Sequence, residues 1–138
     1  MIINGNLNLK GSSIESLGNL KEVNGNLDLW HSKAISFGKL ERVNGGCFID
    51  ESNIMTLNKL KIVKGDFSLV NCKNLISLGD LQIVYGHLNL IGCENLKSLG
   101  KLKSVIGKLV IFGSGITEDY IKKEKPNLFG GESKWIVY

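Results

Sequence analysis

The chain has little proline, few aromatic residues and no block of one charge, and each shortage excludes a class of protein. It has one proline against 17 glycines in 138 residues, which argues against disorder and indicates many tight turns. Aromatic residues make up 7% of the sequence, so leucine, isoleucine and valine must supply the core of a single domain. The net charge of +4, without a Lys/Arg run, is below the excess of a dedicated nucleic-acid binder.

Long apolar runs and metal-binding cysteine patterns are also missing. No apolar run reaches the ~18 residues of a membrane span. The first repeat opens at Ile3, which leaves no room for a signal peptide. The three cysteines are odd in number and lack metal-ligand spacing. We therefore expect a soluble protein with reduced thiols in the cytoplasm, of a bacterium or of an infected host cell, with no membrane contact, no metal and no cofactor.

A seven-residue phrase, V/I-x-G-x-φ-x-φ with φ apolar, organises the chain. It opens at Ile3, Val23, Val43, Val63, Val84 and Val105. A near-constant period of 20 to 21 residues is typical of a repeat protein. Positions are counted here from the opening residue as zero. Position +2 is glycine in all six units, which predicts either a special backbone conformation or a close approach that a Cβ would hinder.

Each unit has two rhythms. Positions +4 and +6 are apolar, and this alternation predicts a short strand with one buried face. In the second half an apolar residue recurs every third position, which predicts an extended or 3₁₀-like return path. The return is too short for a helix, so each unit is one coil whose strand pairs in parallel with its neighbours. The pattern predicts a mainly β, parallel β-solenoid of about six coils over residues 1–116.

The stretch from Val84 to Leu102 reads V-x-G-x-L-x-L followed by x-N-L-x-S-L-G-x-L. This resembles the receptor L-domain type of short leucine-rich repeat and the short repeats of small bacterial and phage-borne proteins. The resemblance covers residues 2 to about 116. It implies a right-handed solenoid that binds proteins and has no catalytic residues. The disulfide-bonded caps of the extracellular receptor domains are absent from this sequence.

The repeat pattern ends at Ile116, and residues 117–138 are expected to cap the same domain. Thr117 as N-cap, two acids, then lysines and a proline predict one short helix whose Tyr120 and Ile121 cover the last coil. Gly130-Gly131 reads as a turn and residues 134–138 as a last strand. The first coil has no equivalent cover. An open edge of this kind predicts a homodimer through the N-terminal coil or through the strand face defined below.

Histidines and cysteines offer little chemistry. His31 and His87 lie three coils apart, so they cannot share a metal or a catalytic triad. Cys72 and Cys93 both stand at +9, a column otherwise filled by serine, and are expected to pack as small residues in a turn. Cys47 stands at a core strand position. No catalytic residue is predicted from these side chains.

Two acids keep a remote alternative open. Asp28 at +5 and Asp50 at +7 of the next coil are diagonal neighbours, roughly 7–8 Å apart. This separation lies within the range of an inverting glycosidase pair. A glycan-active β-solenoid enzyme therefore remains a remote alternative, although the coils are too short to build a deep cleft.

The outward strand positions +5 and +7 should be polar on a solvated face, but several are apolar. We name the apolar set the strand face: Trp30, Phe48, Val70, Ile91, Val110 and Phe112. A contiguous exposed apolar strip marks an interface, and tryptophan is the most frequent hot-spot residue. Alternatively, +7 bends inward, or the tail from Trp135 to Tyr138 folds over it.

A second surface is basic. We name it the basic edge: Lys39, Arg42, Lys59, Lys61 and Lys103. Acids are interleaved with these cations. The leading hypothesis is a non-enzymatic protein-binding module, an adaptor or an inhibitor, that uses the strand face. The alternative is a binder of nucleic acid or another anionic ligand at the basic edge, although stacking aromatics are missing there.

Overall fold

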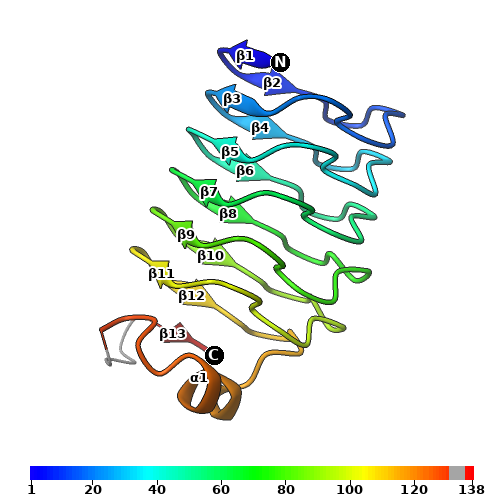
Figure 1. Cartoon of the computed structure of the whole chain (residues 1–138). Helices are drawn as coiled ribbons and strands as arrows, with labels where there is room; N and C mark the ends of the chain where they lie inside the picture. The colour runs from blue at the N-terminus through cyan, green and yellow to red at the C-terminus, as the bar shows by residue number, and fades with distance from the viewer. Residues whose placement is uncertain (131–135) are drawn as a thin grey trace.

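The computed structural model describes residues 1–130 and 136–138, which form a short rod of stacked coils (Figure 1). The predicted mainly β, parallel solenoid with one short C-terminal helix is confirmed. The N- and C-termini lie at opposite ends of the rod (Figure 1). The strands of neighbouring coils pair in register, Ile3 with Val23 in one ladder and Leu7 with Leu27 in another.

Each coil carries two strands rather than the one expected. The first sheet contains β1 (Ile2–Asn4), β3 (Glu22–Asn24), β5 (Arg42–Val43), β7 (Ile62–Val63), β9 (Ile83–Val84) and β11 (Ser104–Val105). The second contains β2 (Leu7–Asn8), β4 (Leu27–Asp28), β6 (Cys47–Phe48), β8 (Phe67–Ser68), β10 (Leu88–Asn89), β12 (Leu109–Val110) and β13 (Ile136–Val137). The opening Val or Ile of every repeat thus lies in the first sheet, whereas the predicted +4 residue lies in the second.

The return path is extended, and the described residues contain no 3₁₀ helix. Its backbone forms isolated parallel bridges between coils, such as Ser16 with Ser36 and Ser77 with Ser98. Of the two conformations predicted for the return path, the structure shows the extended one and not the 3₁₀ helix. Every third side chain still points inward, because the turns on either side of each bridge return the chain to the core.

The glycine column at +2 exists for close approach. A Cβ on Gly45 would lie 2.7 Å from the carbonyl carbon and oxygen of Gly25 in the preceding coil. Within the column only Gly5 has a positive φ (128°), whereas left-handed backbone recurs just after the second strand of each coil, for example at His31 (φ 54°) and Glu51 (φ 55°). The glycine column therefore sets how tightly the coils stack.

The core is one cluster of buried apolar side chains between the sheets and the return path. Phe37, Phe67 and Cys47 are fully buried in it. The first coil is less covered, because Ile3, Leu7 and Leu9 are only half-buried. The corresponding Val23, Leu27 and Leu29 of the second coil are fully buried.

Helix α1 (Glu118–Glu124) closes the other end of the rod. The Oγ1 atom of Thr117 accepts a hydrogen bond from the Tyr120 backbone N–H at 3.1 Å, as an N-cap does. Ile121 is buried and Tyr120 is half-buried against the core. The Tyr120 hydroxyl accepts a hydrogen bond from the Leu99 backbone N–H at 2.9 Å. The predicted capping helix is confirmed.

The last strand extends the second sheet. Ile136 pairs with Leu109 and Val137 with Val110, so β13 lies beside β12. Of the strand expected over residues 134–138, Ile136 and Val137 are confirmed, whereas Lys134 and Trp135 lie outside the described residues, as does Gly131 of the expected turn.

The cap gives a first prediction. Ile121→Ala should lower the free energy of unfolding by about 2–3 kcal/mol, because a buried side chain over the last coil is truncated. Urea denaturation measures this loss. Lys123→Ala on the exposed side of the same helix is the matched control and should change stability by less than about 0.5 kcal/mol. Equal losses for the two variants would show that α1 does not seal the core.

Candidate protein-binding surfaces

The strand face is apolar but unevenly exposed. Phe112 is 65% exposed and Trp30 is 39% exposed. Phe48, Val70, Ile91 and Val110 are half-buried. Neighbouring coils are hydrogen-bonded in register, so these side chains shield one another and leave the largest areas at Trp30 and Phe112. Phe48 and Val110 lie on strands of the second sheet, and each of the other four lies two residues beyond the end of such a strand.

The described part of the tail does not fold over the strand face. Ile136 and Val137 continue the sheet beyond β12. Phe112 remains exposed beside them.

Trp30 is held by its neighbours at the N-terminal end of the strand face. The Lys10 Nζ atom lies 4.4 Å from the centroid of its ring, within the range of a cation–π contact. The imidazole of His31 lies 4.5 Å away, centroid to centroid. His31 in turn reaches Glu51 of the next coil, with 2.8 Å between Nε2 and Oε2. Contacts with Lys10 and His31 therefore fix the position of the indole, whose remaining surface is exposed.

Asp28 and Asp50, the two acids beside the strand face, both accept hydrogen bonds from backbone N–H groups. The Oδ1 atom of Asp28 accepts a hydrogen bond from the Trp30 N–H at 3.0 Å. The Oδ1 atom of Asp50 accepts from the Val70 N–H at 2.9 Å and from the Ser68 hydroxyl at 2.5 Å. These bonds hold the ends of the strands. The two carboxylates were the residues of the glycan-active alternative, which remains untested.

The two histidines stay apart, as predicted. The His87 Nδ1 atom accepts a hydrogen bond from the Lys108 backbone N–H at 2.9 Å. The His87 backbone N–H donates to Asp66 Oδ1 at the same distance. His87 therefore extends a column of side chains that bond to the backbone of the next coil. No group of three or more His, Cys, Asp or Glu residues that could hold a metal ion occurs within residues 1–130 and 136–138.

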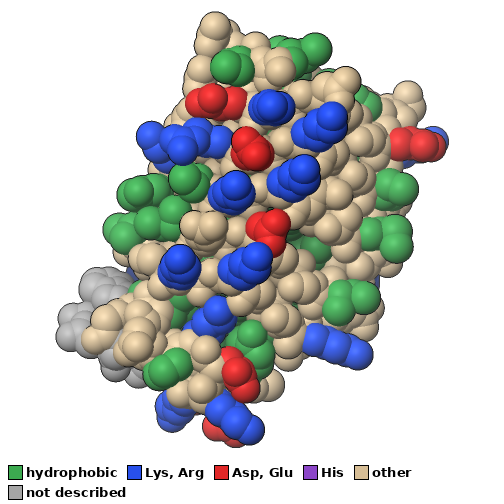
Figure 2. All heavy atoms as spheres, viewed as in Figure 1, with side chains coloured by type: hydrophobic (Ala, Val, Ile, Leu, Met, Phe, Trp, Pro, Cys, Tyr) green, Lys and Arg blue, Asp and Glu red, His purple; other side chains and the backbone are tan. Residues whose placement is uncertain are grey.

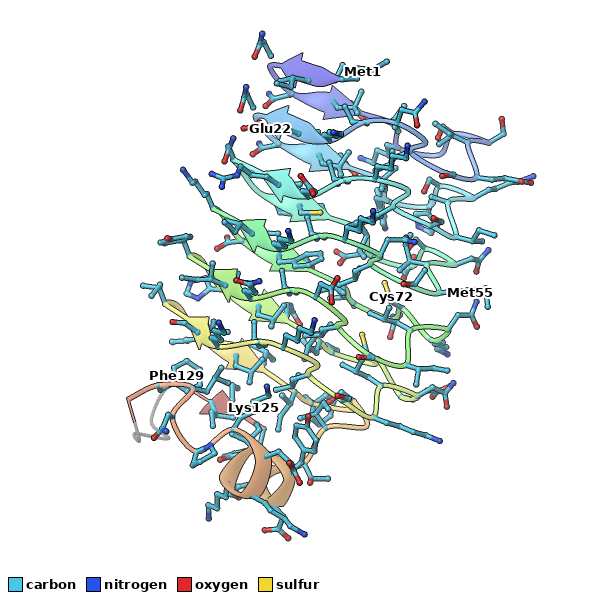
Figure 3. The ribbon with its side chains drawn as sticks, viewed as in Figure 1. Met1, Glu22, Met55, Cys72, Lys125 and Phe129 are labelled. Carbon is cyan, nitrogen blue, oxygen red and sulfur yellow. The ribbon has the colours of Figure 1, made fainter. Side chains whose placement is uncertain are left out.

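The cysteines are buried free thiols. Cys72 Sγ donates to the Ile49 carbonyl at 3.1 Å, and Cys93 Sγ donates to the Leu69 carbonyl at 2.9 Å. Figure 3 shows Cys72 within the coil stack. Burial is the main cause that raises the pKa of Cys72 to about 11 and that of Cys93 to about 12, and it raises the pKa of Cys47 further. All three stay protonated at neutral pH, so none is an activated nucleophile.

The basic edge carries mixed charge. Lys39, Lys59, Lys61 and Lys103 are exposed, and Arg42 is half-buried. Figure 2 shows basic side chains interleaved with acidic ones on this side of the rod. The Lys61 Nζ atom lies 4.0 Å from Glu41 Oε1. A depression of about 350 Å³ beside Arg42 and Lys61 is also lined by Glu22 and Glu41, so both charges face it.

A further apolar surface escaped the sequence analysis. Ile35, Met55 and Ile76 are 43%, 59% and 57% exposed on three successive return turns, and we name them the return stripe. Figure 3 shows Met55 on the return turns, away from the strands. Each directly follows a buried residue of the return path, so in the sequence it looks like part of the apolar core. Aligning the residue that follows the first buried residue of each return path, +12 in the 20-residue units and +13 in the 21-residue units, would have revealed the column. Tyr85 and Ile106 are also exposed, on the outer side of the first sheet.

Comparison with protein-family models, curated proteins and solved structures finds no match to this chain. The resemblance to short leucine-rich repeats therefore stays a prediction from the motif. The only helix in the described residues has seven residues, and none there is long and apolar enough to cross a membrane.

Proposed function

We propose that the chain is a non-enzymatic protein-binding module, an adaptor or an inhibitor, that docks its strand face onto a protein partner. The observation that carries the proposal is the +7 column. It places Val70, Ile91 and Phe112 on three adjacent coils, and Phe112 is 65% exposed. Solvated faces of sheets are normally polar, and a contiguous apolar column at such a place is typical of an interface.

The rigidity of the face also supports binding. The strand backbones are joined coil to coil, for example by the Leu69 N–H to the Asn89 carbonyl at 2.9 Å and by the Leu90 N–H to the Val110 carbonyl at 2.8 Å. Side chains on a pre-ordered backbone lose little conformational entropy on binding. Trp30 supplies the aromatic anchor that such interfaces favour.

The anionic-ligand alternative rests on the basic edge and is weaker. Of its five cations, Lys61 lies 4.0 Å from Glu41, and Glu22 and Glu41 line the depression beside Arg42 and Lys61. The positive charge at this part of the edge is therefore partly neutralised by neighbouring acids. The homodimer through the N-terminal coil also stays a proposal, supported by the half-buried Ile3, Leu7 and Leu9.

The strand face gives a second prediction. The tagged chain, used as bait in extract of the cell that produces it, should retain a specific protein that the Trp30→Ala/Phe112→Asp variant loses. Binding should be lost because the two substitutions remove the most exposed apolar side chains of the strand face, Trp30 and Phe112. Both substitutions are at the surface, so the free energy of unfolding should change by less than about 1 kcal/mol.

Ile106→Asp is the matched control, because Ile106 is 60% exposed on the other sheet. It should retain the same protein. Retention by the strand-face variant as well, or loss by the control alone, would place the binding site elsewhere on the molecule.

A further inference from the structure

The return stripe continues at both ends with charged residues of opposite sign. Glu15 precedes Ile35 in the column, and the Ile35 N–H donates to the Glu15 carbonyl at 2.9 Å. Lys97 follows Ile76, and the Lys97 N–H donates to the Ile76 carbonyl at 2.8 Å. Between them, the Met55 N–H donates to the Ile35 carbonyl at 3.0 Å. Coil by coil, the column reads acid, apolar, apolar, apolar, base.

The column is exposed throughout. Glu15 and Lys97 are exposed, and within residues 1–130 and 136–138 neither forms an ion pair. Along the right-hand edge of Figure 2, an acidic side chain with a basic one directly behind it lies above, apolar side chains lie between and a basic side chain lies below. The next residue along each coil is small: Ser16, Ser36, Thr56, Ser77 and Ser98. The three apolar side chains therefore project as a ridge with free charges at its ends.

This order is self-complementary under a two-fold axis through Met55 and perpendicular to the column. A second copy in the antiparallel direction places Ile35 against Ile76 of the second copy and Met55 against its own equivalent. It also places Glu15 against Lys97 of the second copy at both ends. The parallel arrangement would instead oppose Glu15 to Glu15 and Lys97 to Lys97. Self-complementarity of one patch is the requirement for an isologous dimer.

We propose that a second copy of this chain covers the return stripe in an antiparallel two-fold dimer. The ridge is narrow compared with the ~800 Å² per partner of a stable interface, so the association is weak. Lys33 and Lys73 of the second copy approach each other at the rim, where water and salt screen their repulsion. The dimer leaves the strand face free, so it is independent of the protein-binding role proposed above.

Sedimentation equilibrium of the full chain at concentrations up to about 1 mM tests the proposal, since weak interfaces dissociate at micromolar concentration. We expect a monomer–dimer equilibrium. Met55→Asp places two carboxylates face to face at the axis, and it should weaken the dimer by about 100-fold or more. Ile106→Asp, an equally exposed position on the first sheet, should leave the equilibrium constant unchanged. Far-UV circular dichroism confirms that both variants fold.

Charge reversal tests the antiparallel geometry itself. Glu15→Lys and Lys97→Glu should each weaken the dimer by roughly three- to tenfold, because each opposes like charges at both ends. The double variant restores opposite charges and should return to within about twofold of the unmodified chain. A monomer at the highest concentration overturns the proposal, as does a dimer insensitive to Met55→Asp. Failure of the double variant to recover overturns the antiparallel arrangement.

Discussion

Raising the pH from 9 to 11 should lower the free energy of unfolding by about 6 kcal/mol in total, enough to unfold a chain of ordinary stability. The cause is the three buried thiols. Burial raises the pKa of Cys72 to about 11 and that of Cys93 to about 12 from an ordinary value of 9.0, and raises that of Cys47 further still. The loss is measured by urea denaturation at a series of pH values.

The sign follows from proton binding. Below pH 9 the thiols are protonated in both the folded and the unfolded chain, so they give no pH dependence. Above pH 9 the unfolded chain releases three protons that the folded chain retains. Stability therefore falls as the pH rises until the folded thiols also ionise. Averaged over this range, each thiol contributes about 1 kcal/mol per pH unit, because the unfolded thiols are only half ionised at pH 9 and folded Cys72 begins to ionise near pH 11.

A double variant separates the thiols from other alkaline effects. Cys72→Ser/Cys93→Ser places serine where Ser32 and Ser52 already occupy the same column and are buried. Its stability should fall by only about 1 kcal/mol per pH unit between pH 9 and 11, because Cys47 alone remains. An unchanged slope in the double variant would show that lysine or tyrosine ionisation, rather than thiol burial, controls alkaline unfolding.

Gly45→Ala should cost about 3 kcal/mol or more, although it adds one methyl group. A Cβ there would lie 2.5 Å from the Asn26 Oδ1 atom and 2.7 Å from the Gly25 carbonyl carbon. The carbonyl is backbone, so the coils must separate to accept the methyl group. Overpacking of this kind costs about 1–3 kcal/mol in cores that can relax, and more where they cannot. Thermal and urea denaturation measure the loss.

Gly5→Ala is the matched control in the same column. No atom lies within 4 Å of the added Cβ, but the backbone has φ +128°, so the variant carries a conformational cost alone. We expect a loss of about 1 kcal/mol. If Gly45→Ala were no worse than Gly5→Ala, close stacking of the coils would not be the reason for the glycine column.

The fold could be predicted from the sequence because equivalent positions of the repeat have the same burial in successive coils. Six aligned units place Val43, Val63 and Val84 in one column, and all are fully buried. The cap was equally readable, since Thr117 breaks the pattern and begins a helix with ordinary capping chemistry. The first sheet, which holds the opening Val or Ile of each repeat, was missed because its strands of two or three residues are too short to show alternation.

Exposure was harder to predict than position. The repeat places Val70 and Ile91 at the same position of adjacent coils, two residues beyond β8 and β10, but how far each is covered depends on the side chains of neighbouring coils. Both are half-buried, whereas Phe112 at the end of the column is exposed. The return stripe was missed for the opposite reason. Its residues follow buried core positions directly, so their sequence context indicates burial, and only the turn geometry shows that they face solvent.

The most direct test of the proposed binding function is a titration of the captured protein against the chain at low and high salt. Trp30→Ala/Phe112→Asp should weaken binding by about 100-fold or more, as expected for loss of two hot-spot residues. Raising the salt concentration should change the affinity of the unmodified chain by less than about threefold, because the face is apolar. Unchanged affinity in the variant, or a steep fall with salt, would contradict binding through the strand face; the steep fall would assign binding to the basic edge.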